Sequence, residues 1–188
     1  MPIDSARIEA AVAEMLAAIG EDPARPGLVD TPRRVAEAYA EYFSGLGVDP
    51  QEHLTEAVAT HGTGELVLLR DIRFRSICEH HLLPFLGVAH IAYVPGDRIV
   101  GLGRLPQVLE TLASRPQLQE RLGEEIVDAL QSGLEPKGVL VVIDAVHGCV
   151  TARGARQADS STVTVASRGI LSDPVQRAEV MALIGSAA

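Results

Sequence analysis

The sequence predicts an α+β fold built on an antiparallel sheet, and two patterns support this prediction. From about residue 64 onward, the expected elements follow the order strand, strand, helix, helix, strand, strand. No strand–helix–strand unit repeats, so the parallel sheet of an alternating α/β protein is not expected. Before these elements, apolar residues recur at helical spacing, which predicts a helical N-terminal arm. We therefore divide the 188 residues into an arm over 1–60 and a domain over 61–188 that function as a single unit.

The arm is expected to contain two helices separated by a loop rich in proline and glycine. The first covers residues 5–19, where one apolar stripe recurs every three to four residues, and Gly20 can end it. The second is expected to have Thr31 as its N-cap and Pro32 at its first helical position. Its stripe contains Val35, Ala38, Tyr39, Tyr42 and Phe43.

The domain is expected to contain four strands, over residues 66–75, 88–94, 139–146 and 161–166. The third is a continuous apolar run, as in a buried strand, and the fourth alternates Thr and Val, as in a half-buried one. Helices are expected over 105–113, from Pro116 to Gly133, and over 174–184. A sheet of this size leaves edges and one face uncovered, which favours self-association.

Composition restricts the function classes. The chain is 47% hydrophobic and 22% charged, as in a soluble globular protein. Its net charge of −9 argues against binding to nucleic acids or membrane surfaces, although a small anionic substrate remains compatible. No apolar run reaches the ~20 residues of a membrane span, and no secretory signal is visible. Two cysteines make a poor disulfide framework, so we expect a cytoplasmic protein with free thiols.

Soft metal ligands gather in two short windows. Cys78 and His81 are separated by two residues, and Cys149 follows a predicted buried strand. Two thiolates and one imidazole favour zinc, and three protein ligands leave a position open for water. The alternative is that both cysteines are inert core residues. His80 and His147 lie in the same windows, whereas three histidines lie outside them. His53 and His61 are expected to be solvated loop residues, and His90 a strand histidine whose hydrogen bonds are satisfied.

The motifs CEHHLLPF, HIAYVP, RPQLQERL, AVHGCVTARG and GLVDTPRRVAEAY together resemble the GTP cyclohydrolase I family, over roughly residues 20–170. The resemblance implies the tunnelling fold with the element order given above. It also implies a homodecamer of two pentamers, with each active site built where subunits meet.

The resemblance further implies a zinc-dependent reaction. Zinc held by Cys78, His81 and Cys149 would provide a hydroxide that attacks carbon 8 of GTP, releasing formate and forming 7,8-dihydroneopterin triphosphate for folate or pterin synthesis. His80 would donate a proton to the purine nitrogen, and His147 would transfer protons during the ribose steps.

Substrate contacts are also implied by matching positions. Gln119 and Glu120 match the guanine-recognising positions, and three arginines match the triphosphate-binding positions: Arg34, Arg104 and Arg153. Four residues depart from the family's usual pattern: Glu37, Gly103, Gln107 and Gly148. Two alternatives therefore stay open. One is a paralogue that opens a different or less phosphorylated guanine nucleotide, and the other is an inactive purine-binding homologue.

Overall fold

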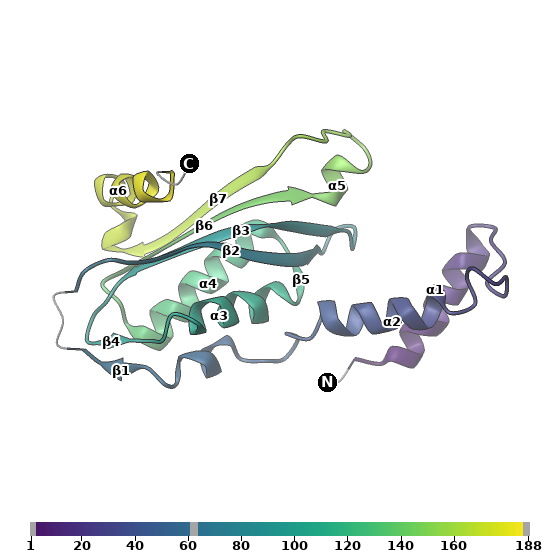
Figure 1. The fold of residues 1–188 in the computed structure, drawn as a ribbon, viewed down its shortest axis with the longest axis horizontal. Coiled ribbons are helices and arrows are strands. Elements are labelled where there is room, and N and C mark those ends of the chain that lie inside the picture. The colour runs from purple at the N-terminus through teal and green to yellow at the C-terminus, as the bar shows by residue number, and fades with distance from the viewer. Residues whose placement is uncertain (1–2, 61–63, 186–188) are drawn as a thin grey trace.

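Helices α3 and α4 cover one face of a five-stranded sheet in the computed structural model, which describes residues 3–60 and 64–185 (Figure 1). The strands lie in the order β5-β2-β3-β6-β7. Their bounds are β2 (Val67–Cys78), β3 (Pro84–Val94), β5 (Pro116–Gln117), β6 (Gly138–His147) and β7 (Thr162–Gly169). Neighbours from β2 to β7 pair antiparallel, which confirms the predicted α+β class, and only the short β5 pairs parallel with β2.

The remaining elements frame this sheet. The helices are α1 (Ser5–Ala18), α2 (Thr31–Tyr42), α3 (Arg104–Ala113), α4 (Gln119–Leu134), α5 (Gly148–Thr151) and α6 (Pro174–Gly185). Two 3-10 turns, η1 (Pro50–Leu54) and η2 (Ile170–Ser172), and a small sheet of β1 (Val58–Ala59) with β4 (Arg98–Ile99) complete the fold. No helix among the described residues is long and apolar enough to cross a bilayer.

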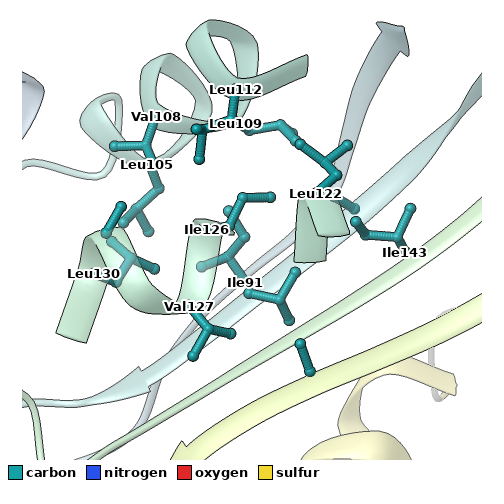
Figure 2. Packing of buried hydrophobic residues seen from close by; sticks show 14 of the residues in the cluster. Ile91, Leu105, Val108, Leu109, Leu112, Leu122, Ile126, Val127, Leu130 and Ile143 are labelled. Atoms are coloured by element: carbon teal, nitrogen blue, oxygen red, sulfur yellow. The ribbon is translucent and has the colours of Figure 1, made fainter. Parts of the chain in front are cut away.

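The main core lies between the sheet and helices α3 and α4. Figure 2 shows Leu105 and Leu109 of α3 and Ile126 of α4 turned toward Ile91 of the sheet, and all four side chains are buried. Burying each such side chain stabilises the fold by about 1.5–3 kcal/mol. A smaller cluster packs α6 against the opposite face of the sheet, so both faces are covered only at one end.

Strands β2 and β3 are longer than predicted, and the additional residues reach the metal-binding motif. The alternation of buried and exposed residues in β2 ends at Arg75, but the strand continues through three buried residues to Cys78, and Ile77 pairs with Pro84. The buried Ser76 hydroxyl donates to the carbonyl of Ala113 at 2.6 Å, which satisfies a polar group in an apolar setting. Cys78 is therefore the last residue of a strand rather than part of a loop.

The predicted start of the fourth helix at Pro116 was wrong. Pro116 and Gln117 instead pair with the end of β2, and Leu118 is an extended N-cap residue. The predicted stop at Gly133 was also early, because α4 continues to Leu134 and ends at Glu135 with a φ of 49°. Gly133 lies inside the helix, where a Cβ would approach Leu54 Cδ1 at 2.5 Å.

The two arm helices pack on each other and project from the domain (Figure 1). The predicted N-cap was one residue too late, since Asp30 occupies that position and Thr31 is already helical. After α2 the chain returns to the domain, where Arg115 donates to the Gly45 and Val48 carbonyls at 2.9 and 2.6 Å. Leu54 then enters the main core. The division of the chain at residue 60 stays a prediction.

Candidate active site

Strand register brings the two cysteines to the same edge of the fold. Cys78 ends β2, and Cys149 lies in the short helix α5 directly after β6. Strand β3 lies between β2 and β6, with Phe85 paired to His147 near its start. A Cβ on Gly148 would lie 2.9 Å from the Pro84 carbonyl oxygen, so glycine permits this close approach of α5 to β3.

The loop between β2 and β3 is a tight turn that presents His81. The Cys78 N–H donates to the Leu83 carbonyl, and the Leu82 N–H donates to the Cys78 carbonyl, both at 2.9 Å. Leu82 has a φ of 51°, a left-handed conformation that non-glycine residues seldom adopt. Within this turn, His81 reaches the two thiols, and the ligand atoms of Cys78, His81 and Cys149 lie within 4.8 Å of one another.

These three residues fit a tetrahedral metal ion. Zinc bonds of about 2.3 Å to sulfur and 2.1 Å to nitrogen place ligand atoms about 3.5–3.8 Å apart, so a small contraction would complete the site. The described residues supply no fourth member of the group, as expected where a coordination position stays open. Burial and the neighbouring Cys78 raise the pKa of the Cys149 thiol, while Arg153 acts in the opposite direction. A bound cation would favour the thiolate form instead.

His147 lies beside this group in a constrained setting. Its ring stacks on Phe85 with centroids 4.7 Å apart and planes 5° from parallel. Its Nε2 lies 2.6 Å from Oε1 of Gln119. Burial lowers the pKa of His147, partly offset by the negative charge of Glu120. Burial therefore favours the neutral imidazole, the form that can accept a proton.

Of the other histidines, His90 agrees with the sequence prediction, whereas His53 does not, because it is half-buried in η1 rather than solvated in a loop. His80 is exposed next to His81, with ring centroids 6.3 Å apart. His53 bonds to the Thr111 hydroxyl at 2.8 Å, and His90 Nδ1 accepts the Asp71 N–H at 3.3 Å. His61 lies outside the described residues.

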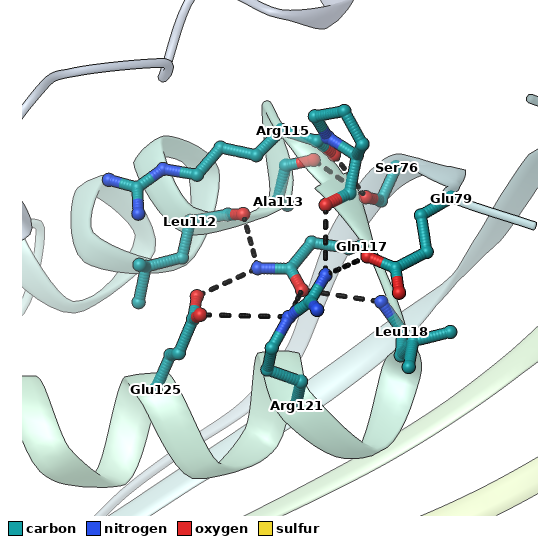
Figure 3. Close-up of polar contacts among 10 residues, drawn as sticks. Ser76, Glu79, Leu112, Ala113, Arg115, Gln117, Leu118, Arg121 and Glu125 are labelled. Atoms are coloured by element: carbon teal, nitrogen blue, oxygen red, sulfur yellow. Dashed lines mark hydrogen bonds and ion pairs between the residues drawn. The ribbon is translucent and has the colours of Figure 1, made fainter.

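A polar network that the sequence did not reveal connects the metal-binding turn to α4 (Figure 3). Arg121 forms an ion pair with Glu79, which lies between Cys78 and His80, and donates to the Pro116 carbonyl and to Gln117 Oε1, both at 3.1 Å. Gln117 itself is buried, and its amide donates to Glu125 at 2.8 Å. The sequence indicated only that Glu79 and Arg121 each lie in one of the quoted motifs, not that they pair. Strand β5, which lies between them in the structure, has two residues and is too short to show a periodic pattern.

The two predicted guanine-binding residues differ in exposure. Glu120 is exposed and lines a cavity of about 450 Å³ together with Gly123 and Thr164. The Gln119 side chain is buried, with 1% of its surface exposed, and its polar atoms contact the protein.

The predicted phosphate-binding arginines are dispersed in the single chain. Arg34 pairs with Asp30 at 3.2 Å, and Arg104 pairs with Glu56 and donates to Gln107 Oε1 at 3.0 Å. Arg104 begins α3 five residues after β4, and Figure 1 shows β4 and α5 at opposite ends of the sheet. Arg153 follows α5, four positions after Cys149.

Glu37, which departs from the family's usual pattern, pairs with Arg33 at 2.7 Å rather than with Arg34. Gly103 caps α3 with open space where a Cβ would be. The structure thus explains glycine at position 148 by the close approach of the Pro84 carbonyl, but it gives no reason for glycine at position 103.

The fold and the site together define an α+β protein with a candidate catalytic metal site at its strand ends. The family described as GTP cyclohydrolase I matches residues 8–185. A protein named GTP cyclohydrolase 1 from Leifsonia xyli subsp. xyli is 61% identical, over 98% of this chain and 97% of that protein. Proteins of the same name from Clostridioides difficile and Bacillus subtilis are 53% and 50% identical, with at least 95% of each chain covered. The chain belongs to the GTP cyclohydrolase I family.

Proposed function

We propose that this protein hydrolyses GTP by opening its guanine ring, releasing formate and forming 7,8-dihydroneopterin triphosphate, with zinc held by Cys78, His81 and Cys149. The observation that supports this most is the convergence of those three ligand atoms within 4.8 Å, in a chain of this family. Zinc bound there would act as a Lewis acid and lower the pKa of a coordinated water toward about 7.

The surrounding side chains divide the remaining tasks. His80 is exposed next to a ligand, where it can donate a proton to the purine nitrogen. His147, whose pKa is lowered by burial, can accept and return a proton during the ribose steps. The carboxylate of Glu120 lines the cavity described above, where it can accept hydrogen bonds from the two adjacent N–H groups of the guanine pairing edge.

We further propose that the working form is a homo-oligomer, a decamer of two pentamers, in the cytoplasm. Met15 of α1 and Ile19, the C-cap of that helix, are 65% and 74% exposed, and Val163 and Val165 of the edge strand β7 are also exposed. Such apolar surface favours burial against another copy. If each active site lies between copies, Arg104 of one copy could contribute to the phosphate site of another.

The proposal is tested by incubating zinc-loaded protein with GTP and identifying products by mass spectrometry and pterin fluorescence. We expect about one zinc per chain and formation of formate and a dihydropterin triphosphate. Cys78→Ser and Cys149→Ser should lose zinc and activity while keeping the assembly. His80→Ala and His147→Ala should keep zinc but lose turnover by roughly 10²–10⁴-fold. Full activity in metal-free protein, or purine binding without turnover, would refute the proposal.

One observation favours a second candidate, the same ring opening on a less phosphorylated guanine nucleotide. Arg34 and Arg104 are both already paired with carboxylates, which reduces the positive charge offered to a triphosphate. Parallel assays with GDP and GMP distinguish the two candidates.

A further inference from the structure

Both polar atoms of the Gln119 side chain are hydrogen-bonded inside the protein. It is the first residue of α4, and its amide nitrogen donates to the carbonyls of Ile143 at 3.0 Å and Thr162 at 2.8 Å. The Thr164 hydroxyl lies 3.2 Å from the same nitrogen. Carbonyl oxygens only accept hydrogen bonds, so the amide nitrogen must face β6 and β7. The amide oxygen must therefore face His147.

This orientation determines the proton position on His147. An amide oxygen only accepts, so the Nε2 of His147, at 2.6 Å, must be the donor. In a neutral imidazole only one nitrogen has a proton, which leaves Nδ1 with its free lone pair. The parallel stack on Phe85 keeps the ring in this plane.

We infer that Gln119 is a positioning residue that fixes the Nε2–H tautomer of His147 and leaves Nδ1 as the ring nitrogen available to the reaction. This inference rests on the proposed role of His147 as a proton carrier. It assigns Gln119 a task different from the guanine contact that its motif suggests. A guanine contact by this side chain would require breaking buried hydrogen bonds and leaving their partners unsatisfied.

Two substitutions separate the oxygen acceptor from the shape of the side chain. Gln119→Met is similar in length but has no acceptor for Nε2. Gln119→Glu keeps an oxygen acceptor for Nε2, and its other oxygen, which faces the Ile143 and Thr162 carbonyls, is expected to be protonated and to donate to them. We expect Gln119→Met to lower kcat by about 10- to 100-fold with KM for GTP changed by less than about threefold. Gln119→Glu should keep the tautomer and most of kcat.

The direct test is solid-state NMR of the zinc-loaded protein with ¹⁵N-labelled histidine. The chain has six histidines, and the spectrum of His147→Gln identifies the resonances of His147 by difference. We expect a protonated Nε2 and an unprotonated Nδ1 in the wild type, and a mixture of tautomers in Gln119→Met. A protonated Nδ1 in the wild type, or an unchanged tautomer in Gln119→Met, would overturn the inference. A raised KM with unchanged kcat would instead identify a guanine contact.

These readouts are independent of whether the proposed function holds. If His147→Gln retained full activity, the proposed proton-carrier role would fail, whereas the tautomer would still report whether Gln119 fixes the ring. The wild-type spectrum requires no variant of Gln119 and therefore decides the tautomer even if those variants fold poorly.

Discussion

His90 lies on β3, on the sheet face opposite to α3 and α4, and its ring nitrogen is hydrogen-bonded at a bulge of β2. The Asp71 N–H donates to its Nδ1, and Asp71 itself has a φ of 58°. Burial lowers the pKa of His90; Arg70 adds to this effect, while Asp71 and Asp144 oppose it. The folded protein therefore holds this histidine neutral at pH values where the unfolded chain begins to protonate it.

Because the pKa of His90 is lower in the folded protein than in the unfolded chain, we predict that His90 makes the protein less stable in acid. As the pH falls below the unfolded value of about 6.5, the unfolded chain binds the proton first, so the free energy of unfolding decreases until the folded pKa is passed. His90→Gln, which can still accept the Asp71 N–H, should lose less stability between pH 7.5 and 5. Thermal unfolding of both proteins across this range measures the difference. Parallel curves would contradict the prediction.

Single residues also show what the sequence could and could not predict. The spacing of Cys78, His81 and Cys149 predicted a shared ligand group, and the structure confirms that their ligand atoms converge. The buried hydrogen bonds of Gln119 could not be predicted, because they depend on the register of β6 and β7. That register brings the Ile143 and Thr162 carbonyls within reach of the same amide nitrogen. Register between distant strands leaves no signal in a single sequence.

At the scale of elements, Arg121 connects the helix that presents Glu120 to the turn that presents His81. Its ion pair with Glu79 and its hydrogen bonds to Pro116 and Gln117 join α4, β5 and the β2–β3 turn. Side chains that orient metal ligands typically affect metal affinity or activity by about 10- to 100-fold. We predict that Arg121→Met weakens zinc binding about tenfold and lowers kcat, without unfolding the protein.

Arg168→Met is the matched control for this prediction. Arg168 of β7 also reaches α4 through two carboxylates, Glu124 at 2.6 Å and Asp128 at 3.0 Å. Among the described residues its ion pairs therefore lie on α4 and not on the metal-binding turn. Competition with a zinc chelator should separate Arg121→Met from both Arg168→Met and the wild type. Equal zinc affinity in all three proteins would mean that the Glu79–Arg121 pair does not orient the turn.

Elements with a clear period were predicted, and those without one were not. Apolar spacing identified α1, α2, α3 and the body of α4. The two-residue strands β1, β4 and β5 and the single turn of α5 are too short to show a period. Pro116 therefore resembled a helix start, although its pairing with Ile77 makes it part of the sheet.

At the scale of the whole molecule, charge is the property that most affects substrate choice. A nucleoside triphosphate would enter a protein of net charge −9, whose candidate phosphate-binding residues Arg34 and Arg104 are each paired with a carboxylate. Gln107 accepts a hydrogen bond from Arg104 and adds no charge. Glu37 is held by Arg33, so it does not directly neutralise Arg34. The remaining positive charge is small for a triphosphate.

We therefore predict weak GTP binding that depends strongly on salt, with a smaller penalty than usual for GDP and GMP. Gln107→Arg should tighten GTP by roughly 3- to 10-fold, because a charge-assisted contact to phosphate is about twice as strong as a neutral one. The binding of GMP should change little, because GMP lacks the outer phosphates.

Gln176→Arg adds the same charge on the exposed surface of α6 and controls for the overall electrostatic field. The measurement is kcat/KM for GTP, GDP and GMP at two salt concentrations in all three proteins. If the wild type already strongly prefers GTP and both substitutions behave alike, other residues bind the phosphates.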